Sequence, residues 1–270
     1  MPTIHANGLN IYYEVSGSGA PLVLMAGLGA DRWMWLRLIP ALAPHFQVIA
    51  FDNRGVGKTD NPPGPSTAQM LAGDTAALIA GLGLEQASVM GHSMGGLVAQ
   101  ALALARPDLI RRLILSATYF GGPHAIPDTD EARHVMSDLA VDPGERLRRL
   151  MRVGCAPGFV EAHPDLVQQW VTYRVANPVA PELYQAQLAV GAALKDPDTC
   201  LEPKLKAVPI PTLIVLGAHD KRVPPGNAEW LHRALPNSMV RSLLNGGHAL
   251  PLEIPEEAAA AVIEFLQEEP

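Results

Sequence analysis

Short apolar runs separated by helical segments are the feature that most restricts what this chain can fold into. The runs lie at residues 21–25, 46–51, 87–90, 112–116 and 211–216. Helical patterns between them cover residues 33–42, 67–82 and 94–105. A run without polar alternation is buried on both faces, as the strands of a parallel sheet are. We therefore predict an α/β fold with a mostly parallel central sheet flanked by helices.

This alternation is interrupted between residues 124 and 203. The interrupted stretch contains helical and loop-like sequence without a clear strand, and the alternation resumes with the run at 211–216. Helices inserted into such a sheet usually lie over the carboxyl ends of its strands, where ligands bind. We predict a core built from residues 1–123 and 204–270 and a helical cap built from residues 124–203.

Charge and cysteine content exclude several classes of function. The chain has 20 basic and 27 acidic residues, a formal net charge of −7, and no basic face, which argues against nucleic acid and anionic membranes as partners. Cys155 and Cys200 match neither a zinc spacing nor a disulfide framework. Residues 1–8 lack the basic and apolar regions of a signal peptide, and the apolar runs are too short to span a bilayer. We expect a soluble, cytoplasmic protein.

The residues from Gly91 to Gly96 match the pattern G-x-S-x-G between a predicted strand and a predicted helix. A serine in this position lies on a sharp turn, where neighbouring glycines let other backbone approach without a Cβ clash. Its hydroxyl projects from the turn, and amides at the start of the following helix face developing negative charge. The pattern predicts Ser93 as a nucleophile.

A serine hydroxyl needs a general base, and the chain has nine histidines. His248 stands out because a Gly-Gly pair makes its loop compact, after the last predicted strand at 239–243 and before the last predicted helix at 255–267. The base needs an orienting carboxylate, and Asp220 follows the strand at 211–216. The chain order Ser93, Asp220, His248 is the order of nucleophile, acid and histidine in one particular fold. We predict these three residues as a catalytic triad.

Acyl transfer also needs two backbone amides for the oxyanion. Met94 offers one at a helix start, and the loop after the first apolar run offers the second. We choose Leu28 as the second donor, with Gly27 as the alternative. Trp33 and Trp35 follow this loop, and their position is as consistent with core packing as with a pocket wall. We assign Gly27 and Trp33 to substrate binding.

Two groups of residues in the interrupted stretch are interpreted as structural. Arginines recur at helical spacing beside acidic residues, which is typical of a solvated helix face. These arginines are Arg146, Arg148, Arg149 and Arg152. Apolar side chains of the same stretch are predicted inside the cap. They are Met136, Leu147 and Met151.

These motifs together resemble the α/β-hydrolase superfamily along nearly the whole chain. The resemblance is carried by residues 26–29, 52–57, 91–96, 217–220 and 247–248. More narrowly, the sequence is similar to small carboxylesterases, enol-lactone hydrolases and cofactor-free haloperoxidases or perhydrolases. The resemblance implies structural roles for the loop at 52–57 and for Asp74. The family often has His-Gly where this chain has Ala26-Gly27, and this departure keeps the backbone donor.

Other motif interpretations fail. Residues 52–59 resemble a phosphate-binding loop, but Asp52 stands where the first glycine is required, and its carboxylate would repel phosphates. The loop at 27–29 lacks the third glycine of a dinucleotide site, and the sequence has no spaced set of metal ligands. We expect neither a cofactor nor a metal. Ser93 at the nucleophile position also argues against haloalkane dehalogenases and most epoxide hydrolases of this fold, which use an aspartate there.

The sequence predicts a serine hydrolase that cleaves carboxylic ester or lactone bonds of a small molecule. Other chemistry on the same triad stays open, including acyl transfer to a peroxide, alcohol or amine and C–C bond hydrolysis. A ligand receptor on the same scaffold is the alternative from another class, and the complete triad argues against it. The oligomeric state is left unassigned.

Overall fold

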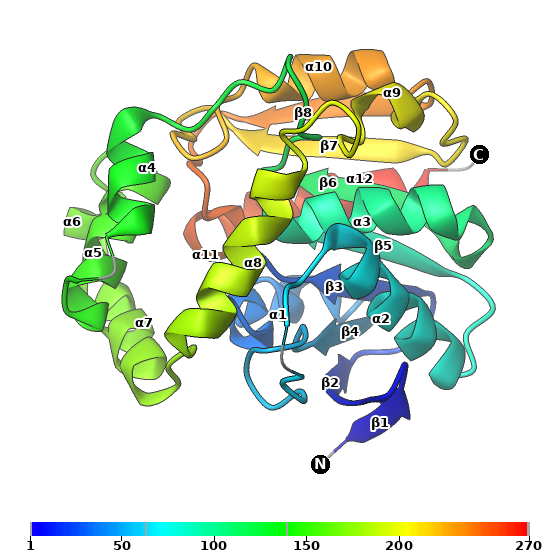
Figure 1. Ribbon diagram of the computed structural model, residues 1–270, viewed down its shortest axis with the longest axis horizontal. Coiled ribbons are helices and arrows are strands. Elements are labelled where there is room, and N and C mark those ends of the chain that lie inside the picture. Colours follow the sequence, from blue (N-terminus) through cyan, green and yellow to red (C-terminus); the bar gives the residue numbers. More distant parts are fainter. Residues whose placement is uncertain (1, 63, 139, 269–270) are drawn as a thin grey trace.

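The computed structural model describes residues 2–62, 64–138 and 140–268 (Figure 1). Five positions lie outside the described residues. Positions 1, 63, 269 and 270 belong to the predicted core, and position 139 belongs to the predicted cap. Over the described ranges the chain forms one eight-stranded sheet, with helices on both faces and a separate group of helices beyond it.

The sheet has the strand order β1-β2-β4-β3-β5-β6-β7-β8. In chain order its strands are β1 (Thr3–Ala6), β2 (Leu9–Ser16), β3 (Pro21–Met25), β4 (Gln47–Phe51), β5 (Ala87–His92), β6 (Ile110–Ser116), β7 (Thr212–Gly217) and β8 (Ser238–Leu243). Strand β2 is antiparallel to both of its neighbours, and every pairing from β4 to β8 is parallel. The predicted mostly parallel sheet is confirmed, and the antiparallel strands β1 and β2 extend it at one edge. The carboxyl ends of β3 to β8 therefore meet at one edge.

Different helices cover the two faces of the sheet. One face packs on α2 (Ala68–Gly81), α3 (Met94–Ala105), α9 (Glu202–Leu205) and α10 (Asn227–Ala234). The other packs on the 3₁₀-helix η1 (Arg32–Trp35), α1 (Ile39–Leu42), α11 (Leu250–Glu253) and α12 (Pro255–Gln267). A second 3₁₀-helix, η2 (Pro107–Leu109), precedes β6. In β3, Leu22 and Leu24 face the second group, while Val23 and Met25 face the first. Burial on both faces explains why the strand sequences are apolar at consecutive positions.

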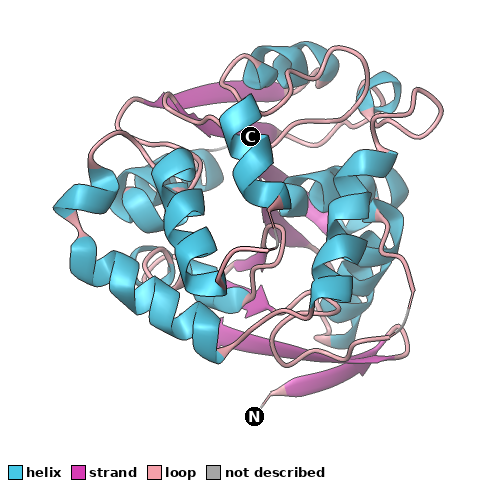
Figure 2. Cartoon of the chain, turned by 60° about the vertical axis from the view of Figure 1, so that its left-hand side comes forward, coloured by secondary structure: helices cyan, strands magenta, loops and turns pink. Residues whose placement is uncertain are grey.

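Five helices form a separate group, which we call the helical insert. They are α4 (Asp130–Ser137), α5 (Pro143–Gly154), α6 (Phe159–Ala162), α7 (Pro164–Ala176) and α8 (Pro181–Ala193). Figure 1 shows α4 to α7 at the left of the sheet and α8 crossing back towards it, and Figure 2 turns this side forward. Helices α5 and α7 pack through a small core of their own, which includes Met151, Val167 and Val171. Asp142 caps α5 by accepting the amide of Gly144.

One predicted helix is wrong. Residues 33–42 are split between the short helices η1 and α1 instead of forming a single helix. Pro40 explains the break, because proline has no N–H to donate to the Leu36 carbonyl and its ring would clash with that carbonyl in a continuous helix. None of the helices in the described part of the chain is long and apolar enough to cross a bilayer.

Candidate active site

Ser93 occupies the sharp turn between β5 and α3. Its φ of 55° and ψ of −120° lie outside helical and extended backbone, which is costly for a residue with a Cβ. Gly95 makes the turn possible, because a Cβ there would lie 2.2 Å from the Met25 carbonyl oxygen. The Ser93 carbonyl accepts the Thr118 hydroxyl at 2.7 Å, and the Ser93 amide donates to the Ser116 carbonyl at 2.9 Å. Surrounding contacts thus hold the strained residue in place.

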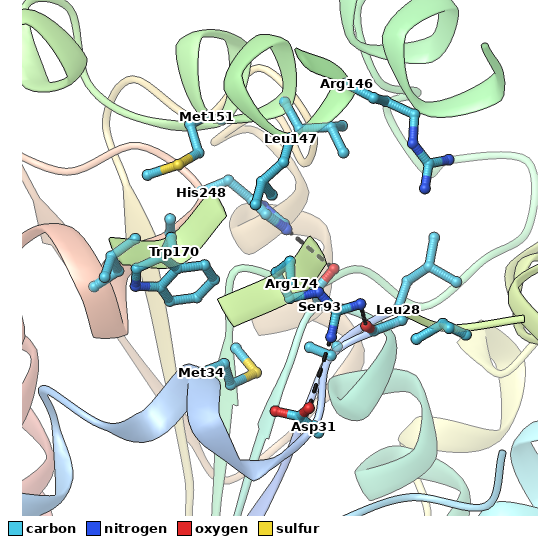
Figure 3. A pocket seen from close by; sticks show the side chains of 18 of the residues that line it. Leu28, Asp31, Met34, Ser93, Arg146, Leu147, Met151, Trp170, Arg174 and His248 are labelled. Carbon is cyan, nitrogen blue, oxygen red and sulfur yellow. Dashed lines mark hydrogen bonds and ion pairs between the residues drawn. The ribbon is translucent and has the colours of Figure 1, made fainter. Parts of the chain in front are cut away.

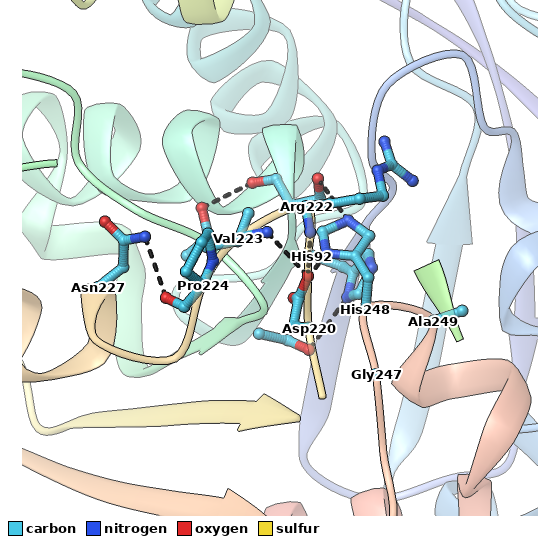
Figure 4. Close-up of polar contacts among 12 residues, drawn as sticks. His92, Asp220, Arg222, Val223, Pro224, Asn227, Gly247, His248 and Ala249 are labelled. Carbon is cyan, nitrogen blue, oxygen red and sulfur yellow. Dashed lines mark hydrogen bonds and ion pairs between the residues drawn. The ribbon is translucent and has the colours of Figure 1, made fainter. Parts of the chain in front are cut away.

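Three side chains from different strand ends form a hydrogen-bonded row. Ser93 Oγ lies 3.1 Å from His248 Nε2, and His248 Nδ1 lies 2.7 Å from Asp220 Oδ2. Asp220 follows β7, and His248 lies in the loop between β8 and α11. Figure 3 shows His248 directed at Ser93, and Figure 4 shows it beside Asp220. The structure brings together the three residues predicted as a triad.

Asp220 is held by backbone as well as by the imidazole. Its Oδ1 accepts the amides of Arg222 and Val223, each at 2.8 Å, and its side chain is fully buried. Since Oδ1 is engaged, Oδ2 is the oxygen available to His248. A carboxylate at Nδ1 favours the tautomer with its proton there, which leaves Nε2 as an acceptor facing Ser93.

The protonation state of His248 suits a base. Burial lowers its pKa from the usual value; Asp220 acts in the opposite direction, and the positive charge of Arg222 lowers it further. The imidazole is therefore neutral and able to accept a proton at neutral pH. His92 is different, because its Nδ1 lies 3.1 Å from the Ser116 hydroxyl, and burial holds its pKa well below the usual range.

A buried glutamate fixes the loop that carries His248. Glu253 Oε2 lies 3.0 Å from the amide of Gly247, and Oε1 lies 2.8 Å from that of Ala249. These two residues flank His248, so one carboxylate holds the backbone on both sides of the imidazole. Glu253 Oε2 also accepts the amide of Ala156 at 2.7 Å, which ties the same loop to the chain just after α5.

The loop after β3 lies directly against the Ser93 turn. A Cβ on Gly27 would meet Ser93 Cβ at 3.2 Å. Within the part of the chain that the structure describes, neither the Leu28 amide nor the Met94 amide donates a hydrogen bond. Leu28 belongs to this loop, and Met94 begins α3. Unengaged amides beside the Ser93 hydroxyl are available to donate hydrogen bonds to a bound oxygen atom.

Two side chains of the insert hold the next residue of that loop, Gly29. Gln187 of α8 accepts the Gly29 amide at 2.7 Å and donates to the Arg54 carbonyl at 3.2 Å. Arg174 of α7 donates to the Gly29 carbonyl at 2.5 Å and lies 3.7 Å from Asp31. The insert therefore fixes the loop at both the amide and the carbonyl of one residue.

Two pockets meet at Ser93. The first pocket has a volume of about 290 Å³ and lies between the loop after β3, η1 and the helices α5 and α7. The second pocket has a volume of about 510 Å³ and lies beside α3 and α8. Leu28, Ser93, Arg222 and His248 line both pockets. A molecule bound at Ser93 can therefore extend into both pockets.

The residues predicted to contact substrate line the first pocket. Gly27 and Trp33 both belong to its wall, and the Trp33 ring stacks on Tyr173 with centroids 4.1 Å apart. Trp35 instead is fully buried in the core, edge-on to His92. Among the described residues, no cluster of three or more His, Cys, Asp or Glu side chains is arranged to hold a metal ion.

The interpretation of Arg146 as part of a solvated helix face is wrong, because Arg146 lines the first pocket. Leu147 and Met151 pack in the core of the insert, as predicted, and they also line this pocket. Met136 of α4 lines the second pocket. Arg152 is exposed, as expected for a solvated face. Of the four arginines, Arg146 faces the pocket, and their helical spacing in the sequence does not indicate which of them does so.

Three further residues of the site were missed from the sequence. They are Gln187, Arg222 and Glu253. Arg222 stands two positions after Asp220, so its place in the loop after β7 is a signal that could have been used. Gln187 and Glu253 carry no local signal, since they act through contacts with distant backbone.

Known proteins resemble this chain over nearly its full length. The model of the family described as alpha/beta hydrolase fold matches residues 20–255. A putative carbamate hydrolase of Azorhizobium caulinodans is 26% identical over 95% of this chain and 94% of its own length.

Two solved structures are similar over core and insert alike. A thermophilic esterase from Thermogutta terrifontis is 28% identical with a TM-score of 0.80, covering 98% of this chain and 97% of its own. The enol-lactonase from Burkholderia xenovorans LB400 is 26% identical with a TM-score of 0.83, covering 99% of this chain and 100% of its own. These likenesses confirm the fold expected from the sequence.

Proposed function

This chain belongs to the alpha/beta hydrolase fold family, and on that premise we propose that it is a serine hydrolase that cleaves carboxylic esters or lactones. The proposal depends on the row of Ser93, His248 and Asp220, with contacts of 3.1 and 2.7 Å. A hydroxyl, an imidazole and a buried carboxylate in this order supply a nucleophile, its base and the group that orients the base. The other proposed site residues are Leu28 and Met94 as oxyanion donors and Gly27 and Trp33 as substrate contacts.

In the first half of the reaction, Ser93 Oγ bonds to the carbonyl carbon while His248 Nε2 takes the hydroxyl proton. The carbonyl oxygen becomes an oxyanion, which the amides of Leu28 and Met94 bind. Asp220 stabilises the imidazolium that has formed. The bond to the leaving oxygen then breaks, that oxygen receives the proton from His248, and the acyl group stays on Ser93.

In the second half, water attacks the acyl carbon. His248 Nε2 takes a proton from the water and returns it to Ser93 Oγ as the bond to the serine breaks. The product is a carboxylic acid, and the serine hydroxyl is restored. With a lactone the released alcohol and the acid belong to one molecule, and the steps are otherwise the same.

The substrate class is supported by similar proteins. The two solved relatives are named as an esterase and an enol-lactonase. The name of the relative from Azorhizobium caulinodans favours carbamates as a second candidate, because a carbamate also presents a carbonyl to the nucleophile. A panel of esters, lactones and carbamates with increasing acyl length separates these candidates.

We also propose that residues 124–203 act as a cap on a core made of residues 1–123 and 204–270. Side chains of this stretch contribute walls to both pockets. In this arrangement the core holds the reacting groups, and the cap decides which acyl and alcohol groups reach them.

Substitution of the nucleophile tests the proposal. Ser93→Ala is expected to lower turnover of p-nitrophenyl acetate and butyrate by about 10⁴-fold or more. The matched control Ser242→Ala changes an exposed serine of β8 and should keep wild-type turnover. A fluorophosphonate probe should label the wild type at Ser93 and leave Ser93→Ala unlabelled. Wild-type turnover by a folded Ser93→Ala variant would remove Ser93 from the mechanism.

A further inference from the structure

Two guanidinium nitrogens, each on an arginine that lines the first pocket, are buried and have no hydrogen-bond partner among the described residues. They are Nη1 of Arg146 and Nε of Arg222. Nearly all buried polar groups in proteins are hydrogen-bonded, because an unsatisfied buried donor costs free energy. Unsatisfied cationic donors in the wall of a pocket are therefore groups that a bound anion can satisfy.

Arg146 has an aromatic neighbour and, among the described residues, no counter-ion. It extends from α5 on the side of the pocket where Leu28 lies (Figure 3). Its guanidinium lies 4.9 Å from the centre of the Tyr184 ring, a contact that supplies no acceptor oxygen. The neighbouring carboxylate on the helix, Glu145, pairs with Arg149 at 3.0 Å. The charge of Arg146 thus remains available to the pocket.

Arg222 is placed at the junction of the two pockets. Its backbone amide binds Asp220, while its side chain extends past His248 and away from that carboxylate (Figure 4). None of the ion pairs formed within the described ranges involves Arg146 or Arg222.

The remaining charges of the pocket do not compensate these two. Asp31 is the one carboxylate among the described residues that line the first pocket. It accepts the Tyr173 hydroxyl at 2.9 Å and lies 3.7 Å from Arg174, which also lines the pocket. Asp31 therefore offsets the charge of Arg174 and leaves two positive charges from Arg146 and Arg222.

The rest of the wall is mainly apolar. Its larger side chains are Trp33, Met34, Leu147, Leu150, Met151 and Trp170. A ligand that fits this surface has an apolar body and a negatively charged group that reaches the arginines.

We propose that the first pocket selects substrates that carry a free carboxylate in addition to the ester or lactone to be cleaved, and that Arg146 and Arg222 bind this carboxylate. The inference rests on the proposed function of the site and adds the charge of its substrate. Guanidinium groups match carboxylates geometrically and form charge-assisted, often bidentate hydrogen bonds with them.

Pairs of esters that differ only in charge test the proposal. The acids are the mono(4-nitrophenyl) esters of adipic and suberic acid, and each has a neutral partner in which a carboxamide replaces the free carboxyl. The wild type is expected to show a kcat/KM at least about tenfold higher for the acid than for its neutral partner at one or both chain lengths. Equal or lower values for both acids would overturn the proposal.

Glutamine variants connect this preference to the arginines. Arg146→Gln and Arg222→Gln are each expected to reduce the ratio of acid to neutral kcat/KM by about tenfold. The matched control Arg152→Gln, exposed on the same helix, should keep the wild-type ratio. The ratio is the readout, because a general loss of folded protein lowers both rates equally. A preference that survives in both pocket variants contradicts the assignment.

A binding experiment separates this inference from the proposed hydrolysis. Ser93→Ala is titrated calorimetrically with adipic acid mono(4-nitroanilide) and with its neutral carboxamide. Tighter binding of the acid, lost on adding Arg146→Gln, supports the carboxylate site even if Ser93 has no catalytic role. Hydrolysis of neutral esters by the wild type without any preference for the acids refutes the carboxylate site and leaves the proposed function standing.

Discussion

The sheet and the helical insert contribute to the site in different ways. Ser93, Asp220 and His248 follow strands β5, β7 and β8, whose parallel pairings set the relative position of their ends. The insert instead contributes side chains that line the pockets or hold loops, such as Arg146 and Gln187. Groups proposed to react are thus positioned by backbone pairing, whereas their surroundings depend on individual side-chain contacts.

Contacts between the two regions converge on the loops beside Ser93. The His248 amide donates to the Gly154 carbonyl at the end of α5, and the Gly29 amide donates to Gln187 of α8. A change in the insert can therefore reach the site without altering a reacting residue. We therefore expect substitutions at strand ends to reduce activity strongly. Substitutions of residues that connect the insert to the loops should reduce it less.

The largest expected effect is on the sheet side. Asp220→Asn should lower kcat by about 10⁴-fold, because an amide at this position no longer favours the His248 tautomer that accepts the Ser93 proton. Steady-state turnover of p-nitrophenyl butyrate measures the loss. The control Asp198→Asn removes an equal charge from an exposed loop and should have no effect. A loss of less than about tenfold would mean that the orienting carboxylate is not needed.

On the insert side we expect a smaller loss from Gln187→Ala. The substitution leaves the Gly29 amide without its acceptor, so the loop that carries Leu28 loosens. We expect kcat to fall by about tenfold to a hundredfold, less than for outright removal of an oxyanion donor. The free energy of unfolding should fall by about 1–3 kcal/mol.

Gln185 provides the matched control for this prediction. It is exposed on the same helix, so Gln185→Ala should retain wild-type activity and stability. Equal activities of the two variants would show that the insert does not support the loop that carries Leu28.

Glu253→Gln should have a still smaller effect on rate. The amide side chain keeps one carbonyl oxygen but loses the second acceptor, so the three amides bound by Glu253 cannot all be satisfied. We expect a loss of about 1–3 kcal/mol in the free energy of unfolding. We also expect kcat to decrease less than it does in Gln187→Ala. Urea unfolding measures the first quantity. Glu256→Gln, exposed at the start of α12, is the control, and equal stability of both variants would contradict the role.

The smallest expected effect is a shift in pH dependence. Protonated His248 cannot accept the Ser93 proton, so kcat/KM should fall as the pH decreases through the His248 pKa. Because burial lowers this pKa, the acid limb should lie below about pH 6.5. The Arg222 charge also lowers it, so Arg222→Gln should move the limb to higher pH. A flat profile between about pH 5 and 8, or a shift to lower pH in the variant, would contradict the assignment.

The strands and the Ser93 turn could be predicted because their signals are local. A continuous apolar run such as 21–25 indicates burial on both faces, and the glycines around Ser93 indicate close backbone approach. The single helix predicted for residues 33–42 failed because Pro40 outweighed its helical pattern. The correct predictions and the wrong one all depend on residues that lie within a few positions of each other in the sequence.

The insert was harder to predict. Periodicity identified α5 as a helix, but it did not reveal that Arg146 faces the pocket while Arg152 faces solvent. Which face of a helix points inward depends on the elements packed against it, and these come from elsewhere in the chain.

By itself the sequence determined the parallel sheet, the turn at Ser93 and the strand ends that carry Asp220 and His248, because short-range patterns and chain order specify them. Only the tertiary structure decided how Gln187, Glu253 and the pocket arginines are used. Gln187 and Gly29, for example, are 158 positions apart, and a hydrogen bond between them exists only once the insert has packed onto the sheet. Side-chain contacts over such separations leave no local pattern, since each partner could occupy its position for many other reasons.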